Sequence, residues 1–362
     1  MDYAVVMAGG AGKRLWPLSR RKRPKQVLKL LDGLTLLRCC FDRLVPIFDP
    51  RNVLILTNAS YVDVVRENLV ELPPENVISE PSVRDTAGAI GLAAAVLTKA
   101  DPDAAMAVVT ADHVIEPDEV FQQALRDALS YINQNPEDLI TFGVKPTFGA
   151  TQFGYMKCVS PVIQPGCKNR IYTVEAFVEK PDEQTAREYL EMGQYFWNSG
   201  MFVWKGRTIL ASLAKFLPET EEPLRKIRHD WSGPGQQATL EEWFPKMPKI
   251  SIDYAVMERS KNVHAIKLDC RWLDMGSFAA LADIITSDRD NNVVVAGSSQ
   301  LLDCKDCIIV TEEKRHLIAA IGLDNMVVAH SKDATLICHV DETQRLKELL
   351  ELVEKSGKEE FL

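Results

Sequence analysis

A glycine-rich segment with a high density of positive charge stands near the N-terminus, directly after a short apolar run. Gly9, Gly10 and Gly12 follow Ala8 and leave the backbone free to turn sharply, so that its N–H groups can approach an anion. Seven cationic residues then occur within thirteen positions: Lys13, Arg14, Arg20, Arg21, Lys22, Arg23 and Lys25. Because a guanidinium offers phosphate a two-pronged set of donors, the segment predicts a polyphosphate site.

Two common phosphate-binding motifs do not fit this segment. A Walker loop requires a glycine where Met7 stands and a serine or threonine where Arg14 stands. The dinucleotide-binding fingerprint requires a third glycine where Leu15 stands. A tight turn followed by a solvated basic segment remains the alternative to a phosphate site.

A single carboxylate follows a second apolar run. Asp112 comes directly after residues 106–110, in the segment Thr110-Ala111-Asp112-His113. Mg²⁺ prefers one or two carboxylates together with phosphate oxygens and water, so Asp112 suits a magnesium ligand. Asp112 fits a helix N-cap equally well, and His113 is better explained as a local hydrogen-bonding residue than as a catalytic base.

The elements that must position these residues alternate along the first 290 residues. Continuous apolar runs predict strands that are buried on both faces, at residues 3–7, 53–57, 106–110 and 139–144. Apolar residues at helical spacing predict helices between them, at residues 34–44, 62–72 and 118–132. This order predicts an α/β fold with a mostly parallel sheet covered on both sides. Ligands bind at the carboxyl ends of such strands, which directs attention to residues after Met7, Thr110 and Val178.

The pattern changes after about residue 290. Short strands are predicted at residues 293–295, 308–310, 317–321, 326–328 and 336–338, with turn residues between them. We therefore expect a large domain over residues 1–288 and a small C-terminal β module over residues 289–362, which is a short β-helix-like structure. A terminal helix over residues 342–355 has one apolar face, which packs on the module or forms a subunit interface in a homodimer.

Composition excludes several classes of protein. At roughly 150 residues per domain, the 362 residues predict one large domain and a smaller one. The net charge of −9 argues against general affinity for nucleic acid or an anionic membrane. The chain contains no transmembrane-length apolar run and begins without a basic signal-peptide region. Eight cysteines, among them Cys304 and Cys307, are interpreted as free thiols, so we expect a cytoplasmic protein.

The glycine segment resembles the signature of the sugar-1-phosphate nucleotidyltransferases. The similarity rests on Gly9-Gly10-x-Gly12-x-Arg14-Leu15-x-Pro17 followed by Pro24-Lys25-Gln26. The longer string Arg14-Leu15-Trp16-Pro17-Leu18-Ser19-Arg20 is similar to the mannose-1-phosphate guanylyltransferase branch of that family. The resemblance continues in the family's order through Glu80-Pro81, Phe177-Val178-Glu179-Lys180-Pro181, Trp197-Asn198-Ser199-Gly200 and Ser251-Ile252-Asp253-Tyr254.

This resemblance implies a Rossmann-like nucleotidyltransferase core and a magnesium-dependent reaction. GMP would pass from GTP to mannose 1-phosphate, giving GDP-mannose and pyrophosphate. Asp112 and Asp274 would hold Mg²⁺, and the catalytic groups would be Arg14, Lys25, Asp112 and Lys180. A different sugar or nucleotide, or a non-catalytic regulatory subunit on the same fold, remain as alternatives.

The resemblance also assigns the binding residues. Glu179 can accept sugar hydroxyl hydrogens, Lys180 can hold the sugar phosphate, and Asp85 or Thr86 is expected to cap the helix under the base. The expected nucleotide-binding residues are Ala8, Gly9, Gly10, Gly12, Lys13, Arg14, Lys25, Asp85, Thr86, Gly88 and Asp112. The expected sugar-phosphate residues are Gly154, Glu179, Lys180, Asn198 and Asp274, with Asn198 supplying an amide for a hydroxyl and Gly154 allowing close approach of the backbone.

Overall fold

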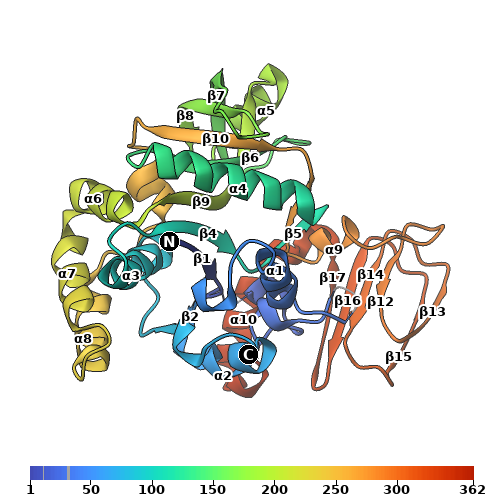
Figure 1. Cartoon of the computed structure of the whole chain (residues 1–362). Helices are drawn as coiled ribbons and strands as arrows, with labels where there is room; N and C mark the ends of the chain where they lie inside the picture. Colours follow the sequence, from blue (N-terminus) through green and yellow to red (C-terminus); the bar gives the residue numbers. More distant parts are fainter. Residues whose placement is uncertain (11, 31–32) are drawn as a thin grey trace.

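A computed structural model describes residues 1–10, 12–30 and 33–362; Ala11 of the glycine segment lies outside the described residues. A large sheet forms the centre of the molecule (Figure 1). Its nine strands among the described residues are, in spatial order, β3 (Val77–Glu80), β2 (Val53–Asn58), β1 (Asp2–Met7), β4 (Ala105–Thr110), β9 (Tyr195–Lys205), β6 (Leu139–Val144), β10 (Val263–Leu268), β8 (Ile171–Val178) and β7 (Gly154–Val162).

The sheet is parallel in one half and mixed in the other. Strands β3, β2, β1 and β4 run parallel, as the apolar runs predict. The long strand β9 then enters antiparallel between β4 and β6, and β8 and β7 are antiparallel to their neighbours as well. The α/β fold class is confirmed, but the expectation of a mostly parallel sheet holds only for the half that begins the chain.

Helices cover both faces of the sheet, because alternate residues of its strands point to opposite sides. In β1, Ala4 and Val6 are buried in one core cluster, and Tyr3 and Val5 are buried in the other. The first cluster includes residues of α1 (Leu36–Leu44), α2 (Val62–Asn68), α4 (Asp118–Gln134) and α5 (Glu183–Met192). The second includes residues of α3 (Asp85–Ala100), α6 (Gly206–Phe216), α7 (Glu221–Asp230) and α8 (Gln236–Trp243).

A separate two-stranded ribbon lies beside the end of β4. It pairs β5 (His113–Glu116) with β11 (Arg271–Asp274) in antiparallel register, so that Asp274 lies opposite His113. The backbone N–H of Met275 also donates to the carbonyl oxygen of Asp112. This pairing brings together two segments that are far apart in the sequence.

The C-terminal strands stack in parallel layers, which confirms the β-helix-like module. Strands β12 (Val293–Val295), β14 (Ile308–Thr311) and β16 (Met326–Ser331) form one parallel stack, with β17 (Ala334–His339) antiparallel at its edge. Strands β13 (Ser298–Leu302) and β15 (Leu317–Ile321) form a second parallel pair. Sequence analysis missed β13, which has an alternation of exposed and half-buried residues rather than an apolar run. The domain boundary at residue 288 stays a prediction.

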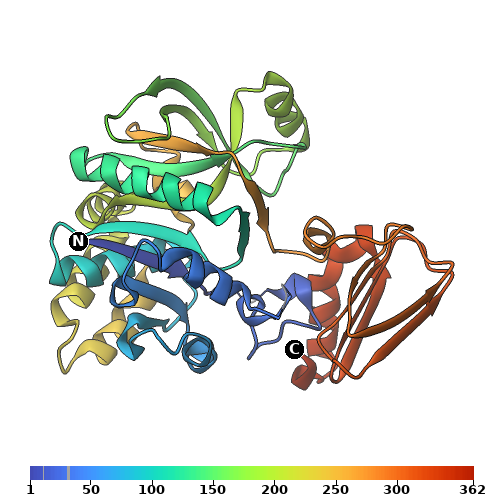
Figure 2. The same cartoon turned by 45° about the vertical axis from the view of Figure 1, so that its right-hand side comes forward.

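The module packs against the segment that follows the glycines (Figure 2). Leu15, Trp16, Leu18, Leu28 and Leu30 share one core cluster with residues of β12, β14, β16, the short helix α9 (Ala279–Ala282) and the terminal helix α10 (Leu346–Lys355). The apolar face of α10 therefore packs on the module and on the N-terminal segment. No helix among the described residues is long and apolar enough to cross a bilayer.

Candidate functional site

Two carboxylates meet where β4 ends. Asp112 follows β4 directly, and Asp274 ends β11, whose pairing with β5 sets the two acids side by side. Ligand atoms of Asp112, His113 and Asp274 all lie within 4.8 Å of one another. The two predicted metal-binding carboxylates are thus brought together by the ribbon.

Lys25 compensates part of the negative charge of these two carboxylates. Its Nζ lies 2.5 Å from Oδ2 of Asp112 and 3.5 Å from Oδ1 of Asp274. Burial alone would lower the pKa of Lys25, but the two carboxylates outweigh burial and raise the pKa above its ordinary value. Burial would likewise raise the pKa of Asp112, but the charge of Lys25 holds the pKa of Asp112 below its usual value. Lys25 and Asp112 are therefore both charged at neutral pH.

The carboxylate pair fits a divalent cation. Oδ1 of Asp274 is buried and accepts no hydrogen bond from the described residues, and a cationic group already lies against both acids. His113 fits poorly as a third ligand. The indole N–H of Trp272 donates to His113 Nδ1 over 3.2 Å, and burial lowers the pKa of His113. The neutral ring then carries its hydrogen on Nε2 and has no free lone pair for a metal.

A cavity of about 360 Å³, called here the loop cavity, opens beside the glycines. Its polar lining includes buried oxygen atoms that accept no hydrogen bond from any described residue: Oε1 of Gln26, Oγ of Ser82 and Oγ1 of Thr110. Buried polar atoms are normally hydrogen-bonded, so these three oxygens indicate a polar ligand. The described residues that line it are Met7, Gly9, Gly10, Gln26, Asn58, Glu80, Ser82, Val83, Asp85, Thr86, Ala89, Thr110 and Asp112.

The glycines allow close packing around this cavity. Gly12 has a φ of +65°, and a Cβ placed on it would lie 2.6 Å from Cβ of Lys25. A side chain at position 12 would therefore push Lys25 out of place. A Cβ on Gly9 would lie 3.3 Å from Oε1 of Glu80. Ala8 is buried behind the loop, and its carbonyl oxygen accepts a hydrogen bond from the hydroxyl of Thr57.

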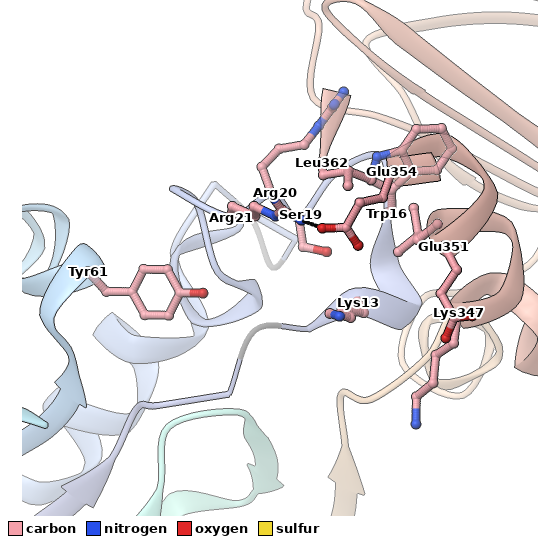
Figure 3. A pocket seen from close by; sticks show the side chains of 11 residues that line it. Lys13, Trp16, Ser19, Arg20, Arg21, Tyr61, Lys347, Glu351, Glu354 and Leu362 are labelled. Atoms are coloured by element: carbon pink, nitrogen blue, oxygen red, sulfur yellow. Dashed lines mark hydrogen bonds and ion pairs between the residues drawn. The ribbon is translucent and has the colours of Figure 1, made fainter. Parts of the chain in front are cut away.

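Six predicted nucleotide-binding residues do not line the loop cavity: Ala8, Gly12, Lys13, Arg14, Lys25 and Gly88. Lys13 instead lines a separate cavity of about 410 Å³ against α10, where Figure 3 shows it near Trp16 and Lys347. Arg14 is half-buried in the short turn Lys13–Leu15 and forms no ion pair with any described residue. Gly88 packs beside Arg84 and Phe244, and a Cβ placed on it would lie 2.6 Å from Cβ of Arg84.

The start of α3 forms the far wall of the loop cavity. The sequence predicted Asp85 or Thr86 as the N-cap of this helix, and that prediction is wrong. The helix begins at Asp85, and Arg84 is the capping residue. Asp85 has a φ of +61°, and its Oδ1 accepts from the N–H of Thr86. The hydroxyl of Thr86 accepts from the N–H of Ile252, which fixes the segment that leads to Asp253.

A second cavity of about 300 Å³, called here the Lys180 cavity, is lined by four of the five predicted sugar-phosphate residues, and Gly154 lies behind Glu179 without lining it. Glu179 is nearly buried and forms an ion pair with Lys180. A Cβ at Gly154 would collide with Oε2 of Glu179, so glycine is required there. The lining of this cavity includes Asp112, Glu179, Lys180, Asn198, Asp253, Trp272 and Asp274.

Asn198 is less available than the sequence suggested. Its Nδ2 donates to Oδ1 of Asp253 over 2.8 Å, and its Oδ1 accepts from the hydroxyl of Thr141 over 2.9 Å. Burial and then the carboxylate of Glu179 raise the pKa of Asp253 to about 7. The amide of Asn198 therefore holds Asp253 in place, and it can offer a ligand only its remaining hydrogen.

The two cavities meet at the predicted metal site. Met7, Thr86, Thr110 and Asp112 line both of them. A ligand in each cavity would therefore have its end near Asp112. Sequence analysis missed Gln26, Glu80, Ser82 and Asp253 as lining residues, although the quoted motifs contained Gln26, Glu80 and Asp253.

Glu80 gives a pH-dependent test of the loop cavity. Burial and then the carboxylate of Asp85 raise its pKa from 4.5 to about 7. Below pH 7 the folded protein therefore holds mostly the protonated form of Glu80, and above pH 7 the buried charge costs stability. At about 1.4 kcal/mol per pKa unit, Glu80→Gln should increase the free energy of unfolding by roughly 2–3 kcal/mol at about pH 8. At about pH 5 the gain should fall below about 1 kcal/mol.

The measurement is urea-induced unfolding followed by tryptophan fluorescence at both pH values. Glu75→Gln is the matched control, because Glu75 is exposed in the turn before the same strand. A gain for Glu80→Gln that does not change with pH, or that equals the gain for Glu75→Gln, would contradict the raised pKa.

Comparison with known proteins identifies the family. Residues 3–291 match the family described as Nucleotidyl transferase, and residues 297–353 match the family described as MannoseP isomerase/GMP-like beta-helix domain. A mannose-1-phosphate guanylyltransferase of Klebsiella pneumoniae is 36% identical over all of this chain and 76% of its own length. Mannose-1-phosphate guanylyltransferase ManC of Salmonella typhimurium is also 36% identical, over 99% of this chain and 74% of its own length.

A solved structure is similar across nearly the whole chain. A protein of Thermus thermophilus, described as a mannose-1-phosphate geranyltransferase, is 33% identical with a TM-score of 0.84. The match covers 98% of this chain and 99% of that protein. Both parts of the chain, the sheet and the β module, are therefore shared with this structure. The chain belongs to the nucleotidyl transferase family of enzymes.

Proposed function

We propose that this enzyme transfers GMP from GTP to mannose 1-phosphate and releases pyrophosphate. The observation that carries the proposal is the meeting of the loop cavity and the Lys180 cavity at Asp112. The names of the relatives, mannose-1-phosphate guanylyltransferase, support the choice of substrates. GTP would occupy the loop cavity, and mannose 1-phosphate would occupy the Lys180 cavity.

The reaction needs positioning and charge neutralisation more than a base. The second pKa of a phosphate monoester is about 6, so the attacking phosphate of mannose 1-phosphate is already mostly a dianion at neutral pH. One of its oxygens would bond to the α-phosphorus of GTP, and the bond from that phosphorus to the bridging oxygen of pyrophosphate would break. One phosphoanhydride replaces another, so the reaction should be reversible.

The chain's own residues have distinct roles in this proposal. Lys180 would hold the sugar phosphate as a point charge, and Glu179 beside it would accept hydrogens from sugar hydroxyls. Lys25 and Arg14 do not line the loop cavity, and they would contact the part of the triphosphate that extends out of it. Asp112 and Asp274 would hold Mg²⁺, which when bound supplies positive charge for the phosphate oxygens.

The cellular setting and assembly are part of the same proposal. All eight cysteines are free, which supports a reducing compartment such as the cytoplasm. Leu349 and Leu352 are exposed on the outer face of α10, which supports a homodimer through that face. Neither point affects the assignment of the two cavities.

The direct test is pyrophosphate release with Mg²⁺ across a matrix of substrates. GTP, ATP, UTP and dTTP are each combined with mannose 1-phosphate and with glucose 1-phosphate. We expect release with GTP and mannose 1-phosphate above every other pair. A different preferred pair would keep the mechanism and overturn the substrate assignment, and no release from any pair would favour a regulatory subunit.

Variants of two lining residues should affect different kinetic constants. Lys180→Ala removes the proposed phosphate-binding charge, so KM for mannose 1-phosphate should rise by roughly tenfold or more while KM for GTP stays within about twofold. Asp112→Ala removes a carboxylate at the junction of both cavities, so kcat should fall by about a hundredfold or more. Both constants come from initial rates of pyrophosphate release.

Lys157→Ala is the matched control for Lys180→Ala. Lys157 lies in the same part of the sheet and is paired with Glu175, and it does not line either cavity. A rise in both KM values for Lys180→Ala, or near-normal turnover in Asp112→Ala, would contradict the assigned roles.

A further inference from the structure

The arginines that follow the glycines contact the C-terminal module instead of the two cavities. Arg20 lies 2.5 Å from Oδ1 of Asp333. Arg21 forms an ion pair with Glu354 of α10, as Figure 3 shows, and Arg23 forms one with Glu312. The interpretation of this whole basic cluster as a polyphosphate site is therefore wrong for these three arginines. Their chemistry needs another explanation.

Glu312 makes the most extensive of these contacts. It follows β14 directly, and its side chain is only 16% exposed. One carboxylate accepts hydrogen bonds from both terminal nitrogens of Arg23 and, over 3.0 Å, from the backbone N–H of Lys29. A single residue of the module therefore binds both ends of the segment from Arg23 to Lys29.

Apolar packing fixes the same segment to the same strand. Leu28 and Leu30 are almost completely buried, and they share a core cluster with Ile308 and Val310 of β14. The polar contact of Glu312 and this apolar contact lie next to each other in the chain. The segment can therefore move little relative to β14.

Lys25 lies in the middle of this segment. Its Nζ reaches Asp112 and Asp274, and its Cβ packs where Gly12 has no side chain. The next residue, Gln26, lines the loop cavity. The place of Lys25 and Gln26 therefore depends on a segment whose two ends are bound by Glu312.

We propose that Glu312 is a positioning residue for GTP binding. Glu312 acts from the C-terminal module, through its effect on the position of Lys25. The proposal rests on the proposed function, because it takes the loop cavity to be the GTP site. Glu312 itself does not line that cavity. Its loss would leave the cavity walls intact and would free the segment that carries Lys25.

The test is the dissociation constant of GTP, measured by calorimetry on the full chain. Glu312→Gln keeps the size of the side chain and removes its charge, so GTP should bind roughly fivefold more weakly. Glu313→Gln is the matched control, because Glu313 is the adjacent, exposed residue and its side chain forms no hydrogen bond or ion pair with a described residue. It should leave the dissociation constant within about twofold of the original chain's.

A double-mutant cycle distinguishes positioning through Lys25 from a general loss of stability. In a Lys25→Met background the further change Glu312→Gln should weaken GTP binding by less than about twofold, because the group that it positions is absent. Thermal unfolding of each variant reports folding. If Glu312→Gln does not fold, Arg23→Gln removes the same contact from the other side and carries the same expectation.

Each outcome decides the proposal. GTP affinity of Glu312→Gln equal to that of Glu313→Gln would overturn it, and so would an equal loss with and without Lys25. Weak or absent GTP binding by the unaltered chain would overturn the proposed function, and this inference with it. Fivefold weaker binding that disappears in the Lys25→Met background supports the positioning role.

Discussion

The ion pair between Lys25 and Asp112, which is mostly shielded from solvent, is the constraint on which the site depends. Their charged atoms lie 2.5 Å apart, with Asp274 next to them. Breaking such a pair by removing one partner leaves an uncompensated buried charge, which costs about 3–5 kcal/mol. The glycine segment, the end of β4 and the β5–β11 ribbon must therefore converge on one point. A cluster of two acids and one base is also where a cation and phosphate groups could exchange partners.

This convergence explains why the module and the catalytic sheet are built as one structure. Lys25 reaches Asp112 from a segment that packs on β14, while Asp274 arrives from β11, just before the chain enters the module. The module thus contacts the segment that carries Lys25, and it follows the segment that carries Asp274 in the sequence. It lines neither the loop cavity nor the Lys180 cavity. In the segment that follows the glycines, Leu28 and Leu30 pack against the module, while Lys25 reaches the carboxylates of the site.

The sequence predicted the elements whose pattern is local. The run at residues 3–7 is apolar on both faces because Val5 and Val6 are buried on opposite sides of the sheet. It could not predict that β9 enters antiparallel beside β4, because that pairing joins residues distant in the chain. Nor could it predict the partners of charged and polar groups. Asn198 is bound by Thr141 and Asp253, and Arg23 by Glu312, through contacts that no spacing encodes.

The most direct test of the central claim is the binding of Mn²⁺, a probe for Mg²⁺, followed by electron paramagnetic resonance. If Asp112 and Asp274 together form the cation site, Asp112→Asn and Asp274→Asn should each weaken Mn²⁺ binding by about tenfold or more. Asp324→Asn serves as the control, because Asp324 is an exposed carboxylate on the module. Unchanged Mn²⁺ affinity in both Asp112→Asn and Asp274→Asn would contradict the account.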